Sequence, residues 1–221
     1  MDADKVREHI IDTYFALRAG MAFSALALPL VLWLGAWILF GTALQPSMSD
    51  YYYTNMGDVF VGVLIAVGAS LTMYKGYSNR EDRILDVAGL LAVGVALIPS
   101  ESGAPASGGG ALITSSLLHG GCAIGFFVAI SWVCIFHAKD TLELIDNETV
   151  VRRYLGWYRI IGALMIAAPI AAGVLNYVIG TGAVVFWAEA IAVWVFAAYW
   201  STKTYELWRS GGDRKMLAAM P

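Results

Sequence analysis

Six apolar segments, separated by short polar connections, dominate the pattern of hydrophobic and polar positions along the chain. A helix that crosses a bilayer needs about 20 apolar residues, and four of the segments reach this length. The second and third segments are shorter and have charged ends, but the compact polar sequence KGYSNRED between them is typical of a turn that joins two spans. The pattern therefore predicts transmembrane helices at 20–43, 58–75, 81–99, 111–136, 157–179 and 182–203.

Two other stretches mix charges with apolar residues at helical spacing, namely DKVREHIIDTYFALR near the N-terminus and KDTLELIDNETVVRRY at 139–154. Both predict short amphipathic helices that lie at the membrane surface. Before the third span, Ser78 or Asn79 is expected to cap the helix. The predicted organisation is an N-terminal interfacial helix (1–18), a six-helix transmembrane domain (19–205) and a C-terminal cytoplasmic tail (206–221).

The cations predict how the spans are oriented. The chain has fourteen Lys and Arg, and none of them falls in the connections 44–58, 99–111 or 179–182. All of them lie before the first span, between the second and third, between the fourth and fifth, after the sixth, or just inside the adjoining end of a span, as Lys75, Arg83, Arg159 and Lys203 do. Cytoplasmic connections carry the excess of Lys and Arg in membrane proteins. We therefore expect an all-α bundle of six transmembrane helices with both termini in the cytoplasm.

Composition agrees with a membrane location. The chain is 59% hydrophobic and only 14% charged, whereas a soluble domain carries roughly 25% charged residues. The net charge of −3 and the scattered cations give no reason to expect a nucleic-acid partner. The expected location is the plasma membrane, most simply a bacterial inner membrane, and the expected partners are membrane lipid and a possible protein partner within the membrane.

Ionisable residues inside apolar spans are costly and are functional hypotheses by default. His119 is about 8 residues, or roughly 12 Å, inside the fourth span, and Glu189 is about 7 residues, or roughly 10 Å, inside the sixth. Both distances are measured from the non-cytoplasmic side, so the two side chains are expected to come within direct or water-mediated hydrogen-bonding reach.

Three more polar residues lie on the same side of the bundle. Asp50 lies in the connection SMSDYYYTNMGDVF, Asp58 opens the second span, and Ser115 is one helical turn from His119. These positions predict an outer-leaflet polar pocket that binds a ligand. The candidate pocket residues are Asp50, Asp58, Ser115, His119 and Glu189.

Structural roles would explain each of these residues singly. His119 and Glu189 could be a buried pair that fixes helix register. Asp58 could be a helix N-cap, and Ser115 could bond to its own backbone. The tyrosines 51–53 fit the aromatic belt that many membrane proteins place at the interface.

Several chemistries are disfavoured by the residues present. The predicted topology leaves His119 as the one outer-side histidine of three, so neither a zinc site nor a bis-histidine haem is expected. The sequence has no phosphate-binding loop, dinucleotide fingerprint or nucleophile elbow. We expect no cofactor and no metal, and no catalytic residue is assigned.

Three segments resemble the six-span DRAM/FRAG/SFK group of membrane proteins, which includes autophagy modulators and a factor in lipid remodelling of GPI anchors. They are QPSMSDYYYTNMGDVF, LLHGGCAIGFF and VFWAEAIAVWVFAAYW, about 43 residues together. The chain also looks like bacterial six-span proteins of the same plan. The resemblance implies that Asp50, His119 and Glu189 are shared polar positions and that the protein handles lipid. SSLLH is similar to a motif of alkaline-ceramidase-like hydrolases, but the two further histidines of their last span are missing here.

Three functions follow from these observations. The first is binding of a lipid or another amphiphile in the outer-leaflet pocket, where the acids favour a cationic or hydroxyl-rich headgroup. The second is an accessory or scaffold subunit of a larger membrane complex. The third is a lipid hydrolase or transferase with His119 as general base.

Overall fold

The computed structural model describes residues 3–100, 109–179 and 182–219, and these residues form helices and turns but no strand. Four helical segments are long and apolar enough to cross a membrane, namely Asp4–Phe40, Ser115–Leu142, Glu148–Leu175 and Ala183–Ser210, while the apolar helix Gly57–Met73 is shorter. The prediction of an all-α chain is confirmed. Length and composition of the four helices mark the chain as a membrane protein.

The helices follow one another with short connections. Helix α1 (Ala3–Leu30) continues through a π-helical turn, η1 (Val31–Gly35), into α2 (Ala36–Phe40). A 3₁₀ turn, η2 (Ser49–Tyr53), precedes α3 (Gly57–Met73) and α4 (Asn79–Leu97). The remaining elements are α5 (Gly109–Trp132), the π turn η3 (Val133–His137), α6 (Ala138–Leu142), α7 (Glu148–Ile179), α8 (Ala183–Ser210) and α9 (Gly212–Ala219).

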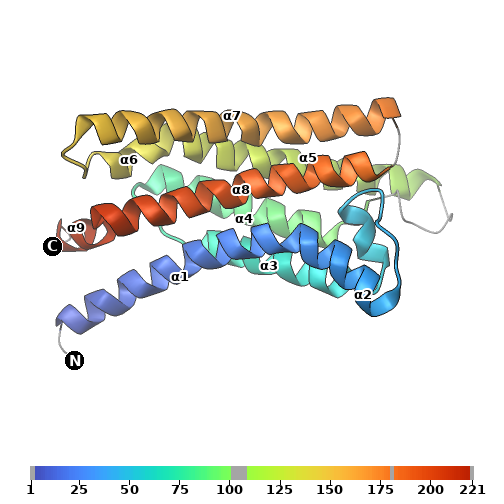
Figure 1. The fold of residues 1–221 in the computed structure, drawn as a ribbon, viewed down its shortest axis with the longest axis horizontal. Coiled ribbons are helices and arrows are strands. Elements are labelled where there is room, and N and C mark those ends of the chain that lie inside the picture. The colour runs from blue at the N-terminus through green and yellow to red at the C-terminus, as the bar shows by residue number, and fades with distance from the viewer. Residues whose placement is uncertain (1–2, 101–108, 180–181, 220–221) are drawn as a thin grey trace.

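The six long helices run side by side (Figure 1), and their contacts form a closed ring. Around the ring, α1 contacts α3, α3 contacts α4, α4 contacts α5, α5 contacts α7, α7 contacts α8, and α8 returns to α1. Both termini lie at one end of the ring, together with the turns that precede α4 and α7. Residues 41–56 lie at the opposite end, which we call the loop end.

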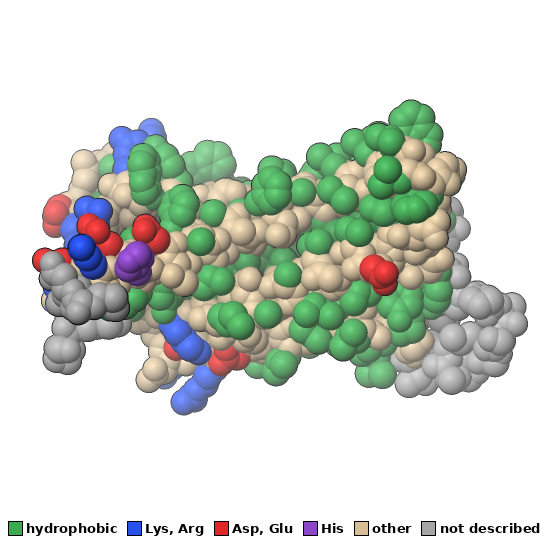
Figure 2. All heavy atoms as spheres, turned by 90° about the horizontal axis from the view of Figure 1, so that it is seen from below, with side chains coloured by type: hydrophobic (Ala, Val, Ile, Leu, Met, Phe, Trp, Pro, Cys, Tyr) green, Lys and Arg blue, Asp and Glu red, His purple; other side chains and the backbone are tan. Residues whose placement is uncertain are grey.

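Basic residues gather at the end that holds the termini, which we call the cationic end. On the face shown in Figure 2, Lys and Arg side chains are visible there and none is visible at the loop end. Side-chain contacts agree, because Arg18 bonds to Asp213 of α9 and Lys215 bonds to the carbonyl of Leu144. The described cations are therefore grouped as the sequence predicts.

Helix starts follow from capping residues. Ser78 is the N-cap of α4, as predicted, and its hydroxyl accepts a hydrogen bond from the Glu81 amide at 3.3 Å. Asn147 plays the same part for α7, since its side-chain oxygen accepts from the Thr149 and Val150 amides. Such side chains satisfy amides that have no partner in the first helical turn.

Both predicted surface helices differ from the structure. Residues 139–154 were expected to form one interfacial helix, but α6 ends at Leu142 and α7 begins at Glu148. The break is caused by the turn that Asn147 caps. At the N-terminus, residues 3–18 continue into the first long helix without interruption, and the predicted boundary at 205 falls inside α8.

Candidate functional site

A cavity of about 570 Å³ lies inside the ring of helices, close to the loop end. It is lined by residues 46–50 of the loop and by side chains from all six long helices. Its walls are mostly apolar and include Leu64, Val95, Phe126, Phe127 and Val193. Two of its lining residues, Ile124 of α5 and Gly173 of α7, are exposed. The cavity is therefore not sealed off on the side of these two helices.

Asp50 contributes one polar wall of this cavity and is 3% exposed. Its carboxylate accepts a hydrogen bond from the Ser47 amide at 3.1 Å, and the Ser47 hydroxyl accepts one from the Asp50 amide at 3.2 Å. This reciprocal pair is the arrangement of a capping box. It starts the 3₁₀ turn η2 and holds the carboxylate at the cavity.

Glu189 reaches the same cavity from α8. Its carboxylate accepts a hydrogen bond from the Met48 amide at 2.6 Å. One turn earlier on α8, the Phe186 amide donates to the Pro46 carbonyl at 3.0 Å. These two bonds fix residues 46–48 against the N-terminal part of α8. The loop therefore forms a defined wall of the cavity.

His119 lines the cavity from α5 and bonds to the end of α4. Its Nδ1 lies 2.7 Å from the Ile98 carbonyl oxygen. Because a carbonyl can only accept, Nδ1 carries the hydrogen, and Nε2 is an acceptor in the neutral ring. The bond fixes both the orientation and the tautomer of the imidazole.

His119 and Glu189, which were predicted to come within direct or water-mediated reach, make no direct hydrogen bond to each other. Each is hydrogen-bonded to a backbone group, and no hydrogen bond joins the two among the described residues. They nevertheless line one cavity, which Asp50 also lines. The described lining residues include these two carboxylates and neither Lys nor Arg.

Two predicted pocket residues lie outside the cavity. Asp58 is exposed in the first turn of α3, where an acid interacts favourably with the helix dipole, and Met56 takes the N-cap position. Ser115 does not line the cavity, but its neighbour Ser116 does. One residue along a helix is a rotation of about 100°, so the wall of the cavity takes Ser116 and leaves out Ser115.

The tyrosines of the loop also differ from the predicted interfacial belt. Tyr51 is fully buried against the Phe186 ring, with centroids 5.9 Å apart. Burial raises the pKa of its phenol. Tyr53 is exposed, and its hydroxyl donates to the Ser100 carbonyl at 2.9 Å. Tyr51 therefore belongs to the packing beneath the loop, whereas Tyr52 is half-buried and Tyr53 is exposed.

A second polar cluster, which the sequence reasoning missed, lies at the cationic end. The Arg18 guanidinium is fully buried and binds both carboxylate oxygens of Asp213, at 3.2 and 2.6 Å. The Tyr77 hydroxyl donates to the same carboxylate at 3.2 Å. Burial and the Asp213 charge raise the pKa of Tyr77, so its hydroxyl stays protonated and keeps this bond.

Lys203 and Glu206 of α8 continue this cluster, and both are at most 1% exposed. Lys203 donates to the Thr141 hydroxyl at 2.6 Å and lies 3.8 Å from Glu206. The Tyr158 hydroxyl donates to Glu206. The predicted domain boundary at 205 separates Lys203 in the last span from Glu206 in the tail, but their three-residue spacing puts both on one helix face. That spacing, beside the Trp and Tyr residues of α8, is the signal that could have revealed the pair.

Comparisons with known proteins identified no relative, since no family model, curated protein or solved structure matched the chain. Within the described residues, no group of three or more His, Cys, Asp or Glu side chains could hold a metal ion. The function therefore has to be argued from the cavity itself.

Proposed function

We propose that the protein is a six-span membrane protein that binds a lipid or another amphiphile in the cavity at the loop end. The observation that carries the proposal is that Asp50, His119 and Glu189, from three separate parts of the chain, line one largely apolar cavity. A site with a few fixed polar groups at one end and apolar walls is the usual form of a small-molecule site.

The chemistry of the cavity favours one class of ligand. Two carboxylates with no lining cation attract a cationic or hydroxyl-rich headgroup, which can donate hydrogen bonds to them. The phenylalanines and aliphatic side chains of the walls suit an acyl or other hydrocarbon chain. An opening between α5 and α7 would let such a chain enter sideways from the bilayer.

Topology and location are part of the proposal. The grouping of cations at one end supports a cytoplasmic position for that end and for both termini. The cavity then belongs to the outer leaflet of a plasma membrane, with a bacterial inner membrane as the simplest case. Under this arrangement α3 and α4 are also spans. They are the shortest of the six helices, and each packs against two neighbouring helices of the ring.

The resemblance to the DRAM/FRAG/SFK group also supports the proposal of lipid binding. The three segments that carry it contain Asp50, His119 and Glu189, which line the same cavity. Their convergence supports a shared role in handling lipid. It adds no nucleophile for hydrolysis, and the Nδ1 of His119 is held by the Ile98 carbonyl, which leaves Nε2 as the acceptor.

Thermal unfolding of the detergent-solubilised protein tests the binding proposal. Phosphatidylethanolamine, a diacyl glycolipid and phosphatidylcholine are added separately to wild type, Asp50→Asn and Glu189→Gln. A charge-assisted hydrogen bond contributes about 1.5–3 kcal/mol, so each substitution should weaken binding about tenfold to hundredfold and reduce the lipid-induced rise in Tm.

Asp58→Asn is the matched control, because it removes an exposed carboxylate near the loop end without touching the cavity. It should keep the full lipid-induced rise. If no lipid raises the Tm of the wild type, or if the control loses as much as Asp50→Asn, the scaffold function replaces the binding function.

A further inference from the structure

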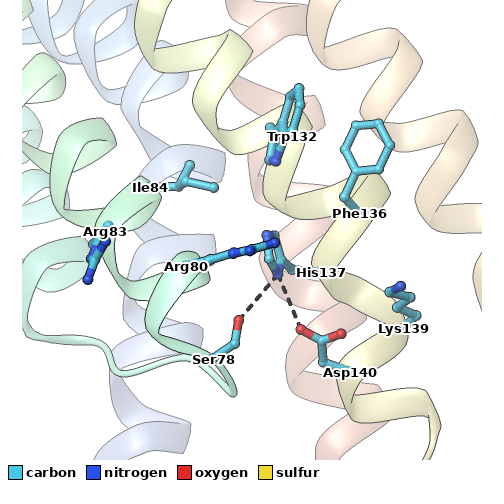
Figure 3. A pocket seen from close by; sticks show the side chains of 9 residues that line it. All are labelled: Ser78, Arg80, Arg83, Ile84, Trp132, Phe136, His137, Lys139 and Asp140. Carbon is cyan, nitrogen blue, oxygen red and sulfur yellow. Dashed lines mark hydrogen bonds and ion pairs between the residues drawn. The ribbon is translucent and has the colours of Figure 1, made fainter.

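A groove of about 730 Å³ opens at the cationic end, between the start of α4 and the segment η3–α6 (Figure 3). Ile84, Trp132 and Phe136 form its apolar part. Three cations belong to the groove, Arg80 and Arg83 from α4 and Lys139 from α6. In Figure 3, Arg80 extends across the groove towards His137, while Arg83 and Lys139 lie on either side of it.

A fixed framework holds the two sides of this groove together. The Nδ1 of His137 lies 3.3 Å from the Ser78 hydroxyl and 3.2 Å from the Asp140 carboxylate. His137 closes the π turn η3, and a π turn inserts one residue into a helix and so changes the facing of the residues after it. The cap of α4 and the start of α6 are therefore joined at the base of the groove.

The charge of the groove is not balanced by acids. Among the described residues, no ion pair includes Arg80, Arg83 or Lys139, and all three side chains are exposed. The one acid of the groove, Asp140, is bonded to His137. The groove thus presents three unneutralised cations beside a single engaged carboxylate, which suits an anion.

The position of the groove suits a lipid more than a soluble anion. Trp132 and Phe136 are 51% and 50% exposed, and both belong to the membrane-crossing segment Ser115–Leu142. Lys139 follows within one helical turn. Aromatic side chains next to cations are typical of the interface between acyl chains and headgroups. Basic pockets between transmembrane helices bind anionic headgroups in this setting.

We propose that this groove binds an anionic phospholipid of the leaflet at the cationic end. The phosphate bonds to the Arg80 guanidinium, which extends across the groove and can make paired hydrogen bonds to it, while Arg83 and Lys139 add positive charge on either side. The first part of an acyl chain packs on Trp132 and Phe136. This site is separate from the cavity at the loop end and shares no lining residue with it.

Native mass spectrometry of the full chain tests the site, with phosphatidylglycerol and phosphatidylcholine offered in equal amounts. The wild type should retain phosphatidylglycerol preferentially. Each cation near an anionic lipid changes the affinity about fivefold, so Arg80→Gln/Arg83→Gln/Lys139→Gln should lower phosphatidylglycerol retention about 100-fold. Phe136→Ala should lower retention of the long-chain lipid while leaving the preference for the anionic headgroup in place.

The matched control is Lys5→Gln/Arg153→Gln/Arg214→Gln, which removes the same charge from exposed positions outside the groove. It should retain phosphatidylglycerol as the wild type does. Equal losses in the two triple variants would show diffuse attraction to charge and overturn the site. Stabilisation of the wild type by inorganic phosphate as strong as that by phosphatidylglycerol would assign the groove to a soluble anion and overturn the lipid.

Discussion

Ser115 and Ser116 are identical neighbours on α5, and only Ser116 lines the cavity. A leucine at 116 would occupy ligand volume, whereas a leucine at 115 would not. We therefore expect Ser116→Leu to abolish the lipid-induced rise in Tm and Ser115→Leu to preserve it, as measured by thermal unfolding with and without lipid. Loss of the rise in both variants, or in neither, would contradict the cavity as the binding site.

Lys203 and Glu206 provide the second prediction for single residues. Removal of one member of a buried ion pair costs about 3–5 kcal/mol, because the other charge stays buried without compensation. Glu206→Gln should therefore lower the free energy of unfolding by about this amount, measured by denaturant titration in detergent. Glu148→Gln is the control, because Glu148 is 89% exposed in its ion pair with Arg152.

The double variant Lys203→Met/Glu206→Leu should recover most of the lost stability, since apolar replacement of a whole buried pair is often neutral or stabilising. A double variant as unstable as Glu206→Gln would show that the charges do more than compensate each other.

The sequence places His119 and Glu189 at similar depths by counting residues from the span ends, and Asp50 in the loop above them, and all three line one cavity. The cavity is lined by Ser116 and not by Ser115, because depth does not determine which side of a helix faces inward. Lys203 and Glu206 were not singled out, because their burial against α6 and α7 comes from tertiary packing.

Helices α3 and α4 pack unusually closely through a pair of glycines. A Cβ added at Gly68 would lie 2.7 Å from the Gly89 carbonyl oxygen, and a Cβ at Gly89 would lie 2.5 Å from the Gly68 carbonyl oxygen. Such small-residue contacts let helix backbones approach in membrane proteins. The backbones of α3 and α4, the two shortest helices of the ring, can therefore pack directly against each other at this point.

Gly68→Ala and Gly89→Ala should each destabilise the protein by about 1–3 kcal/mol, because the clash is with backbone that cannot move aside. The measurement is the free energy of unfolding in detergent. Gly62→Ala on the same helix is the control, since its added Cβ would meet nothing within 4 Å. A neutral result for both tight glycines would mean that α3 and α4 separate easily.

Element boundaries were predictable where a capping residue stands before a helix. Ser78 follows this rule, and the start of α4 was anticipated from it. Asn147 follows it too, but the charged and apolar residues on both sides of it suggested one amphipathic helix. The amphipathic pattern favours one continuous helix there, whereas Asn147 favours a new helix start. The new start is the one observed, because the Asn147 side chain satisfies amides that would otherwise lack partners.

For the whole molecule, the proposed orientation has a direct test. Single cysteines at Asn55 and Asn147, both exposed, are introduced into a Cys122→Ala/Cys134→Ala background. A membrane-impermeant thiol reagent on intact cells should label position 55 and should label position 147 only after permeabilisation. The reason is that the described cations gather at the end that holds residue 147. Labelling of position 147 in intact cells would overturn the orientation and the assignment of both lipid sites to their leaflets.

The pairing of Arg18 with Asp213 has a consequence for how the chain is made. The two residues are 195 positions apart, and synthesis at roughly 5–20 residues per second separates their emergence by on the order of 10–40 seconds. During this interval Asp213 has not yet been added to the chain, so the Arg18 guanidinium lacks this partner. The ring therefore closes at this end only after the last helices have been translated. A nascent chain that stalls before Asp213 lacks the contact between Arg18 and α9. This missing contact distinguishes it from a chain in which α9 has been made.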